Sequence, residues 1–126
     1  IRSILLNHPR VELIEPLDYD ESVACMKKSK IIITDSGGIQ EEAPSLSKPV
    51  LVIRETTERI EAIEAGTAKL IGTNPKDIFN ATKQLLTNKD NYSAMSKKLN
   101  PYGDGRASER IMNICEDFIN DNQVGK

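Results

Sequence analysis

The chain has 126 residues, of which 38% are hydrophobic and 29% are charged, as expected of one soluble globular domain. Its formal net charge is −2 with both signs spread along the sequence, and this excludes the basic stripe that nucleic-acid-binding domains carry. No run approaches the roughly 18 apolar residues that a membrane-spanning helix needs, and no signal peptide is visible. We therefore expect a cytoplasmic protein that binds neither nucleic acid nor membrane.

Short apolar runs alternate with amphipathic stretches along the chain. The runs predict strands over 11–14, 31–34, 49–53 and 68–71; the continuous β-branched run at 31–34 suits a strand buried on both faces. Apolar residues at helical spacing predict helices over 19–28, 39–46, 57–65, 75–87, 90–99 and 107–120. This alternation predicts βαβ units and therefore an α/β fold with a doubly wound parallel sheet.

The two cysteines, Cys25 and Cys115, lie far apart in the sequence, each in a predicted helix beside apolar residues. We expect two buried free thiols rather than a disulfide. No cluster of metal-ligating residues is visible in the sequence, so we predict neither a metal site nor a cofactor.

The most informative loop is Thr34-Asp-Ser-Gly-Gly-Ile-Gln-Glu-Glu42, which follows the most strand-like run and opens a helix. Ligands of open α/β sheets bind beyond the carboxyl ends of the strands, where such loops lie. The two glycines let the backbone approach a ligand, the helix start offers free N–H groups, and Ser36 adds a hydroxyl. Glu41 and Glu42 follow one turn later, where a carboxylate can accept hydrogen bonds from both hydroxyls of a ribose. Residue chemistry alone leaves a nucleotide site and a plain capped helix equally open.

Several contiguous segments share a resemblance to one enzyme family. They are Glu15–Tyr19, Asp35–Leu46, Lys48–Arg54, Thr56–Arg59, Lys69–Thr73 and Asn100–Gly105. Together, in order and in register, they closely resemble the non-hydrolysing UDP-N-acetylglucosamine 2-epimerases over nearly the whole chain. The resemblance implies two Rossmann-like halves in the GT-B arrangement, with residues 1–126 as the UDP-binding, C-terminal half and the N-terminal catalytic half absent.

The same resemblance implies which residues hold UDP. The backbone at 36–38 would bind the phosphates, and Glu42 would bind the ribose. Arg59 would reach the charged end of the nucleotide, where a guanidinium fork suits phosphate oxygens, and the loop 17–22 would lie against the uracil. The implied set is Leu17, Ser22, Ser36, Gly37, Gly38, Glu42 and Arg59.

The implied reaction interconverts UDP-N-acetylglucosamine and UDP-N-acetylmannosamine. UDP leaves by anti elimination to give a 2-acetamidoglucal, and then adds back with inverted configuration at C2. The resemblance places the acid and base carboxylates in the absent half, so we assign no catalytic residue here and expect the chain alone to be inactive. It also implies a homodimeric full-length enzyme that serves cell-surface polysaccharide biosynthesis.

Three other functions stay open at this point: a hydrolysing epimerase, a GT-B glycosyltransferase that uses a UDP-sugar, and a domain that senses nucleotide sugars. The block Asp35–Leu46 joined to Thr57–Arg59 favours the non-hydrolysing epimerase. Arg54 follows a predicted strand, and the sequence leaves open whether it lines the cleft or pairs with Glu55 or Glu58.

Overall fold

A computed structural model describes residues 2–5, 8–97 and 99–123 of the chain. Its elements in chain order are α1 (Arg2–Leu5), α2 (Tyr19–Lys28), β1 (Ile32–Thr34), α3 (Gly37–Glu42), the 3-10 helix η1 (Ala43–Leu46), β2 (Val50–Val52), α4 (Ile60–Glu64), β3 (Ala68–Leu70), α5 (Pro75–Thr87), α6 (Lys89–Ser96) and α7 (Ala107–Gln123).

The three strands form one sheet in the order β1-β2-β3, and both pairs are parallel. Ile32, Val50 and Ala68 lie in one row across the sheet, so the three strands end at the same edge. Parallel neighbours need crossover connections, and α3–η1 and α4 supply them. The predicted α/β fold with a parallel sheet is confirmed.

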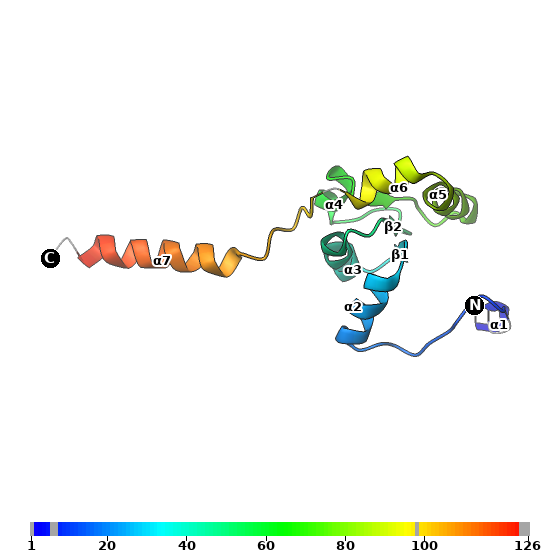
Figure 1. Ribbon diagram of the computed structural model, residues 1–126, viewed down its shortest axis with the longest axis horizontal. Helices are drawn as coiled ribbons and strands as arrows, with labels where there is room; N and C mark the ends of the chain where they lie inside the picture. The colour runs from blue at the N-terminus through cyan, green and yellow to red at the C-terminus, as the bar shows by residue number, and fades with distance from the viewer. Residues whose placement is uncertain (1, 6–7, 98, 124–126) are drawn as a thin grey trace.

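Helices cover both faces of the central strand, which explains its unbroken apolar sequence. Val50 and Val52 point to one face and Leu51 to the other, and all three are at most 1% exposed. Figure 1 shows α2 and α3 on one side of the sheet and α5 and α6 on the other. The first face packs against buried residues of α2, η1 and α4, and the second against α5: Met26, Ala43, Ala62, Ala81 and Leu85.

Side-chain caps fix where two of these helices begin. Asp18 accepts a hydrogen bond from the Glu21 backbone N–H at 3.0 Å while the Glu21 carboxylate accepts from Asp18 N, a reciprocal capping box at the start of α2. Asn74 accepts from the backbone N–H of Lys76 at 2.9 Å and precedes Pro75, the first residue of α5. Such a cap supplies on the order of 1 kcal/mol.

The predicted strand at 11–14 is wrong. These residues belong to no helix or strand, and Val11, Leu13 and Ile14 are 37%, 39% and 54% exposed. Alternating apolar and polar side chains favour a strand, but a strand also needs a neighbouring strand for its backbone hydrogen bonds. No strand in the described ranges pairs with this segment.

Other predicted boundaries moved by a few residues. The helix predicted over 39–46 begins earlier, at Gly37, and ends as the 3-10 helix η1. The helix predicted over 57–65 begins only at Ile60. Residues 57–59 form a loop instead, in which the backbone N–H of Arg59 donates to the Thr57 hydroxyl. The predicted helix over 90–99 runs from Lys89 to Ser96, and residue 98 lies outside the described ranges.

The expectation that both cysteines are buried is also wrong, since each is exposed. On α2 the buried position is Met26, and the adjacent Cys25 points away from the core. Cys115 lies on α7, which projects from the body of the molecule (Figure 1). Both thiols are free, as predicted.

The projecting helix carries an apolar stripe that faces solvent. Ile111, Ile114 and Ile119 are 59%, 67% and 54% exposed, although their spacing is that of a helix face that packs against a core. Over the described residues, none of the helices is both long and apolar enough to span a bilayer.

Candidate functional site

The candidate site forms where the first two strands end. The backbone N–H of Ile53 donates to the Thr34 carbonyl at 3.0 Å, which continues the β1–β2 ladder to the end of both strands. The Thr34 hydroxyl then accepts from Ser36 N at 3.0 Å and turns the chain toward α3, where Ser36 stands at the N-cap. The loop 35–38 and the loop 53–59 therefore leave the sheet side by side.

A buried glutamine joins these two loops. Gln40 is 0% exposed, and its side-chain amide nitrogen donates to the Ser36 carbonyl at 3.2 Å. Its side-chain oxygen accepts from the Thr57 hydroxyl at 2.7 Å, and that hydroxyl accepts in turn from the backbone N–H of Arg59 at 3.2 Å. Buried amides need such partners, because an unpaired one costs about 1–3 kcal/mol.

The Arg59 side chain crosses in front of Gly37. Its Nε donates to Glu41 at 2.8 Å and its Nη1 donates to Glu58 at 2.8 Å. A Cβ atom at Gly37 would lie 3.2 Å from Arg59 Cζ and 3.3 Å from Nη2, which is tighter than ordinary van der Waals contact. The glycine is what lets a guanidinium rest against the first turn of α3.

Hydrogen bonds and neighbouring charges shift the pKa values of Arg59 and Glu58. The hydrogen bond to Glu41 is the main cause that raises the pKa of Arg59 above its usual value. A hydrogen bond from its own backbone N–H, followed by the positive charge of Arg54, lowers the pKa of Glu58. No other described side chain accepts a hydrogen bond from Arg59 Nη2, so this donor is available to a ligand.

Of the alternatives left open for Arg54, the structure shows pairing: its Nη1 lies 3.3 Å from the Glu58 carboxylate. Glu55 has a different role, since it accepts from the backbone N–H and the hydroxyl of Thr73 at 3.2 and 2.8 Å. That carboxylate ties the loop after β2 to the loop after β3.

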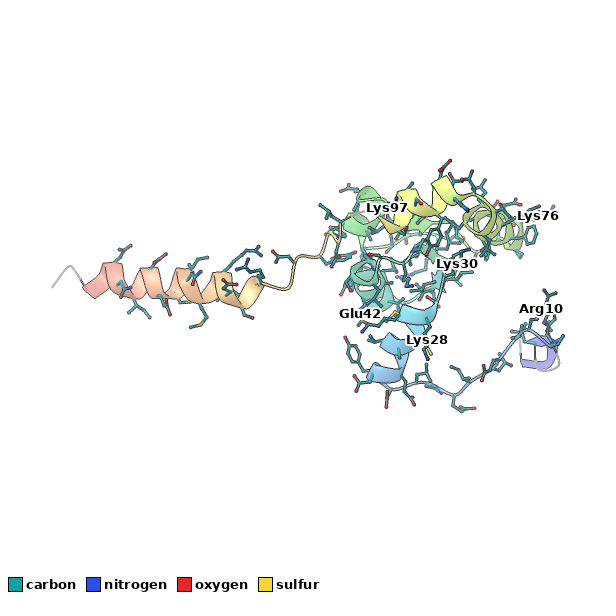
Figure 2. All side chains as sticks on the ribbon, in the orientation of Figure 1. Arg10, Lys28, Lys30, Glu42, Lys76 and Lys97 are labelled. Atoms are coloured by element: carbon teal, nitrogen blue, oxygen red, sulfur yellow. The ribbon has the colours of Figure 1, made fainter. Side chains whose placement is uncertain are left out.

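Glu42 lies on the outer side of α3, away from the sheet (Figure 2). It is half-buried and lines an open hollow of about 600 Å³ between α3 and the loop 100–105, together with Glu41 and Tyr102. The carboxylate is thus accessible at the end of the same helix whose first turn faces Arg59.

The residues predicted to bind the phosphates lie together in the structure. Those predicted to contact the uracil lie at another element, α2. Ser36, Gly37 and Arg59 meet at the start of α3, as described above. Leu17 precedes the cap of α2, and Ser22 lies in the first turns of this helix, which packs against η1. Within the described part of the chain, no hydrogen bond or ion pair links Leu17 or Ser22 to the loop 35–38.

Gln40 and Thr57 had no assigned role in the sequence analysis, although both lie inside the family-like segments. A sequence signal for Gln40 existed: it precedes Ala43 and Pro44 by three and four residues, so it shares the buried face of its helix. Thr57 gives no such signal, because its partner lies 17 residues earlier in the chain.

The arrangement suits the binding of an anion that carries neighbouring hydroxyl groups. It offers a guanidinium donor beside Gly37, the first-turn backbone of α3 and a carboxylate acceptor at Glu42. Among the described residues, no group of three or more His, Cys, Asp or Glu side chains is placed to hold a metal ion.

Comparisons with known proteins show the family of the chain. The sequence model of the family described as UDP-N-acetylglucosamine 2-epimerase matches residues 1–116. The UDP-N-acetylglucosamine 2-epimerase of Campylobacter jejuni is 56% identical over 114 residues, which is 90% of this chain and 30% of that protein. The chain thus spans about a third or less of the relatives that it matches.

Solved structures give the same result. A UDP-N-acetylglucosamine 2-epimerase from Listeria monocytogenes, described as putative, superposes with a TM-score of 0.90 at 48% identity, covering 95% of this chain and 32% of that one. The UDP-GlcNAc 2-epimerase of Neisseria meningitidis bound to UDP-GlcNAc superposes with a TM-score of 0.86 at 48% identity, covering 92% and 32%. With a family match over most of its length and close structural neighbours of the same kind, this chain belongs to the UDP-N-acetylglucosamine 2-epimerase family.

Proposed function

We propose that residues 1–126 are the UDP-binding domain of an enzyme that interconverts UDP-N-acetylglucosamine and UDP-N-acetylmannosamine by eliminating and re-adding UDP. The observation that carries the proposal is the Arg59 guanidinium against Gly37, with its Nη2 donor bonded to none of the described residues. Family membership and the UDP-GlcNAc-bound relative from Neisseria meningitidis support it.

The start of α3 would bind the diphosphate of the nucleotide, and the end of α3 would bind its ribose. The diphosphate would meet Arg59 and the backbone N–H groups at the start of α3. The ribose would meet Glu42, whose carboxylate can accept from two adjacent hydroxyls. The uracil would lie toward Leu17 and Ser22, on the side of α2.

In the elimination, this domain would stabilise the departing UDP and keep it beside the glycal until it adds back. Removal of the C2 proton needs a base. We assign none among the residues described here and propose that the rest of the full-length protein supplies it. The exposed apolar stripe of α7, with Ile111 and Ile114, is available to pack against that part of the protein.

By the family resemblance, we also propose a cytoplasmic, homodimeric full-length enzyme. Its mass in light scattering at micromolar concentration tests the dimer: twice the mass of one chain supports it, and a monomer rejects it.

Proton NMR on the full-length protein, incubated with UDP-N-acetylglucosamine in D₂O, tests the reaction. UDP-N-acetylmannosamine with deuterium at C2 is the expected product, because the proton removed is exchanged with solvent before UDP returns. Free N-acetylmannosamine with UDP would instead indicate a hydrolysing enzyme, and an unchanged sugar nucleotide would indicate a transferase or a sensor. The isolated chain of residues 1–126, as the matched control, should give no product.

A further inference from the structure

We propose that Gln40 and Thr57 act as positioning residues, a pair that we call the loop clamp, which sets Arg59 in place for the diphosphate of the nucleotide. The proposal rests on the function proposed above, because it concerns the same site. It assigns a role in ligand binding to two side chains that need not touch the ligand.

The loop clamp contains a buried amide. Gln40 is 0% exposed on a helix face where an aliphatic side chain of similar size would fill the space without needing partners. The amide is satisfied at both ends, by the Ser36 carbonyl at 3.2 Å and the Thr57 hydroxyl at 2.7 Å. Its distinctive contribution is therefore the connection between the loop after β1 and the loop after β2.

The Thr57 hydroxyl donates one hydrogen bond and accepts another. The hydroxyl has one proton and gives it to Gln40 Oε1, so its lone pairs remain to accept the backbone N–H of Arg59 at 3.2 Å. Arg59 adopts φ −96° and ψ 64° at the N-cap of α4, outside the helical region. The clamp thus fixes the backbone conformation from which the Arg59 side chain extends.

On the opposite side of the loop clamp, Gln40 holds the Ser36 carbonyl. The Ser36 carbonyl accepts from the side chain of Gln40 and also from its backbone N–H at 3.3 Å. Those two bonds hold the peptide that leads into Gly37, the residue against which the guanidinium lies. Both surfaces of the Arg59–Gly37 contact are therefore set by the same buried amide.

The carboxylates that pair with Arg59 cannot provide this precision alone. The Glu41 and Glu58 side chains are 45% and 58% exposed, and exposed ion pairs contribute little because solvent screens them. They also move with the side chain that they bind. A neutral network around the fully buried amide of Gln40 is the more rigid support.

The test uses Thr57 in the full-length protein, since this residue is half-buried. Thr57→Val keeps the shape and removes the hydroxyl, whereas the matched control Thr57→Ser keeps the hydroxyl. In isothermal titration with UDP, Thr57→Val should weaken binding by roughly 5- to 15-fold, the scale of one or two lost hydrogen bonds. Thr57→Ser should stay within about twofold of the wild type. Thr57→Ala, which lacks both the hydroxyl and the methyl, substitutes for Thr57→Val if that variant fails to fold.

A double-mutant cycle separates positioning from a general loss of structure. If Thr57 acts through Arg59, Thr57→Val should cost less than about twofold in an Arg59→Met background. An equal loss in both backgrounds, or wild-type affinity for Thr57→Val alone, overturns the loop clamp while leaving the UDP site intact. A wild-type protein that binds no UDP overturns both proposals.

Discussion

The contact between Arg59 and Gly37 makes a sharp prediction about two adjacent glycines. A methyl group at Gly37 would lie 3.2–3.4 Å from Cζ, Nη2 and Nε of Arg59, whereas one at Gly38 would meet only the Ser36 hydroxyl, at 3.9 Å. Gly37→Ala therefore forces the guanidinium to move by a few tenths of an ångström, and Gly38→Ala does not.

The expected loss follows from what the guanidinium contributes. A charge-assisted hydrogen bond to a phosphate is worth about 1.5–3 kcal/mol, so losing part of it by misalignment should weaken UDP binding by about 5- to 10-fold. Stability should not fall, because neither glycine has a positive φ and alanine is favoured over glycine in a helix by up to about 1 kcal/mol.

Isothermal titration with UDP and calorimetric Tm, both on the full-length protein, provide the assay. Gly38→Ala is the matched control: it makes the same chemical change one residue along the same helix, and it should lose less than about threefold in affinity. The reasoning fails if Gly37→Ala binds UDP as the wild type does, or if the control loses as much as Gly37→Ala.

Three further predictions concern other parts of the molecule. Glu42→Gln should weaken UDP binding by about 1–3 kcal/mol in the same titration, and an unchanged affinity removes Glu42 from the ribose site. Leu51→Ala should lower the free energy of unfolding in urea by about 2–5 kcal/mol, while Ile33→Ala, on the same face but 44% exposed, should cost less than half as much; equal losses would contradict the assigned core. The hydrogen bond from Arg110 lowers the pKa of Asp104 below its usual 3.8, so their pairing stabilises the start of α7 above that pH and is lost as the pH falls through the lowered pKa. The helical circular dichroism of wild type and Asp104→Asn should therefore differ at pH 6 and converge on acidification, and a difference that persists at acid pH would refute this pairing.

Where the signal was local, the sequence predicted the structure well. The apolar run at 49–53 predicts a strand, and β2 is buried on both faces. The run at 31–34 was expected to be buried on both faces, but this is wrong for one face of β1, where Ile33 is 44% exposed. The start of α5 follows from Asn74 and Pro75, because a cap and a first-turn proline act within one helical turn.

Where the outcome depended on a distant partner, the sequence was insufficient. The segment 11–14 has the alternation of a strand but no strand beside it among the described residues. Cys115 shares an apolar stripe on α7, and the pattern predicts a face to be buried without showing that anything covers it.

In the candidate site, too, the local features were predictable from the sequence and the contacts between distant residues were not. The loop around Ser36 was found because glycines between a strand and a helix form a local pattern. The contacts that complete the site, from Gln40 to Thr57 and from Glu41 to Arg59, span 17 and 18 residues. They depend on β1 and β2 being neighbours in the sheet, and no property of either segment alone specifies that pairing.

Under the proposed function, the charge balance of the site determines how it would hold a diphosphate. The guanidinium groups of Arg54 and Arg59 are matched by the carboxylates of Glu41 and Glu58, so these four groups present no excess of positive charge. Recognition must then rest on donors fixed in direction, above all Arg59 Nη2 beside Gly37, rather than on a general attraction for anions. Fixed donors would hold the diphosphate both while it is bonded to the sugar and after it has left, and their hydrogen bonds would strengthen as the departing UDP gains negative charge. An enzyme that must release UDP from the sugar and still keep it in place for the return step needs that property.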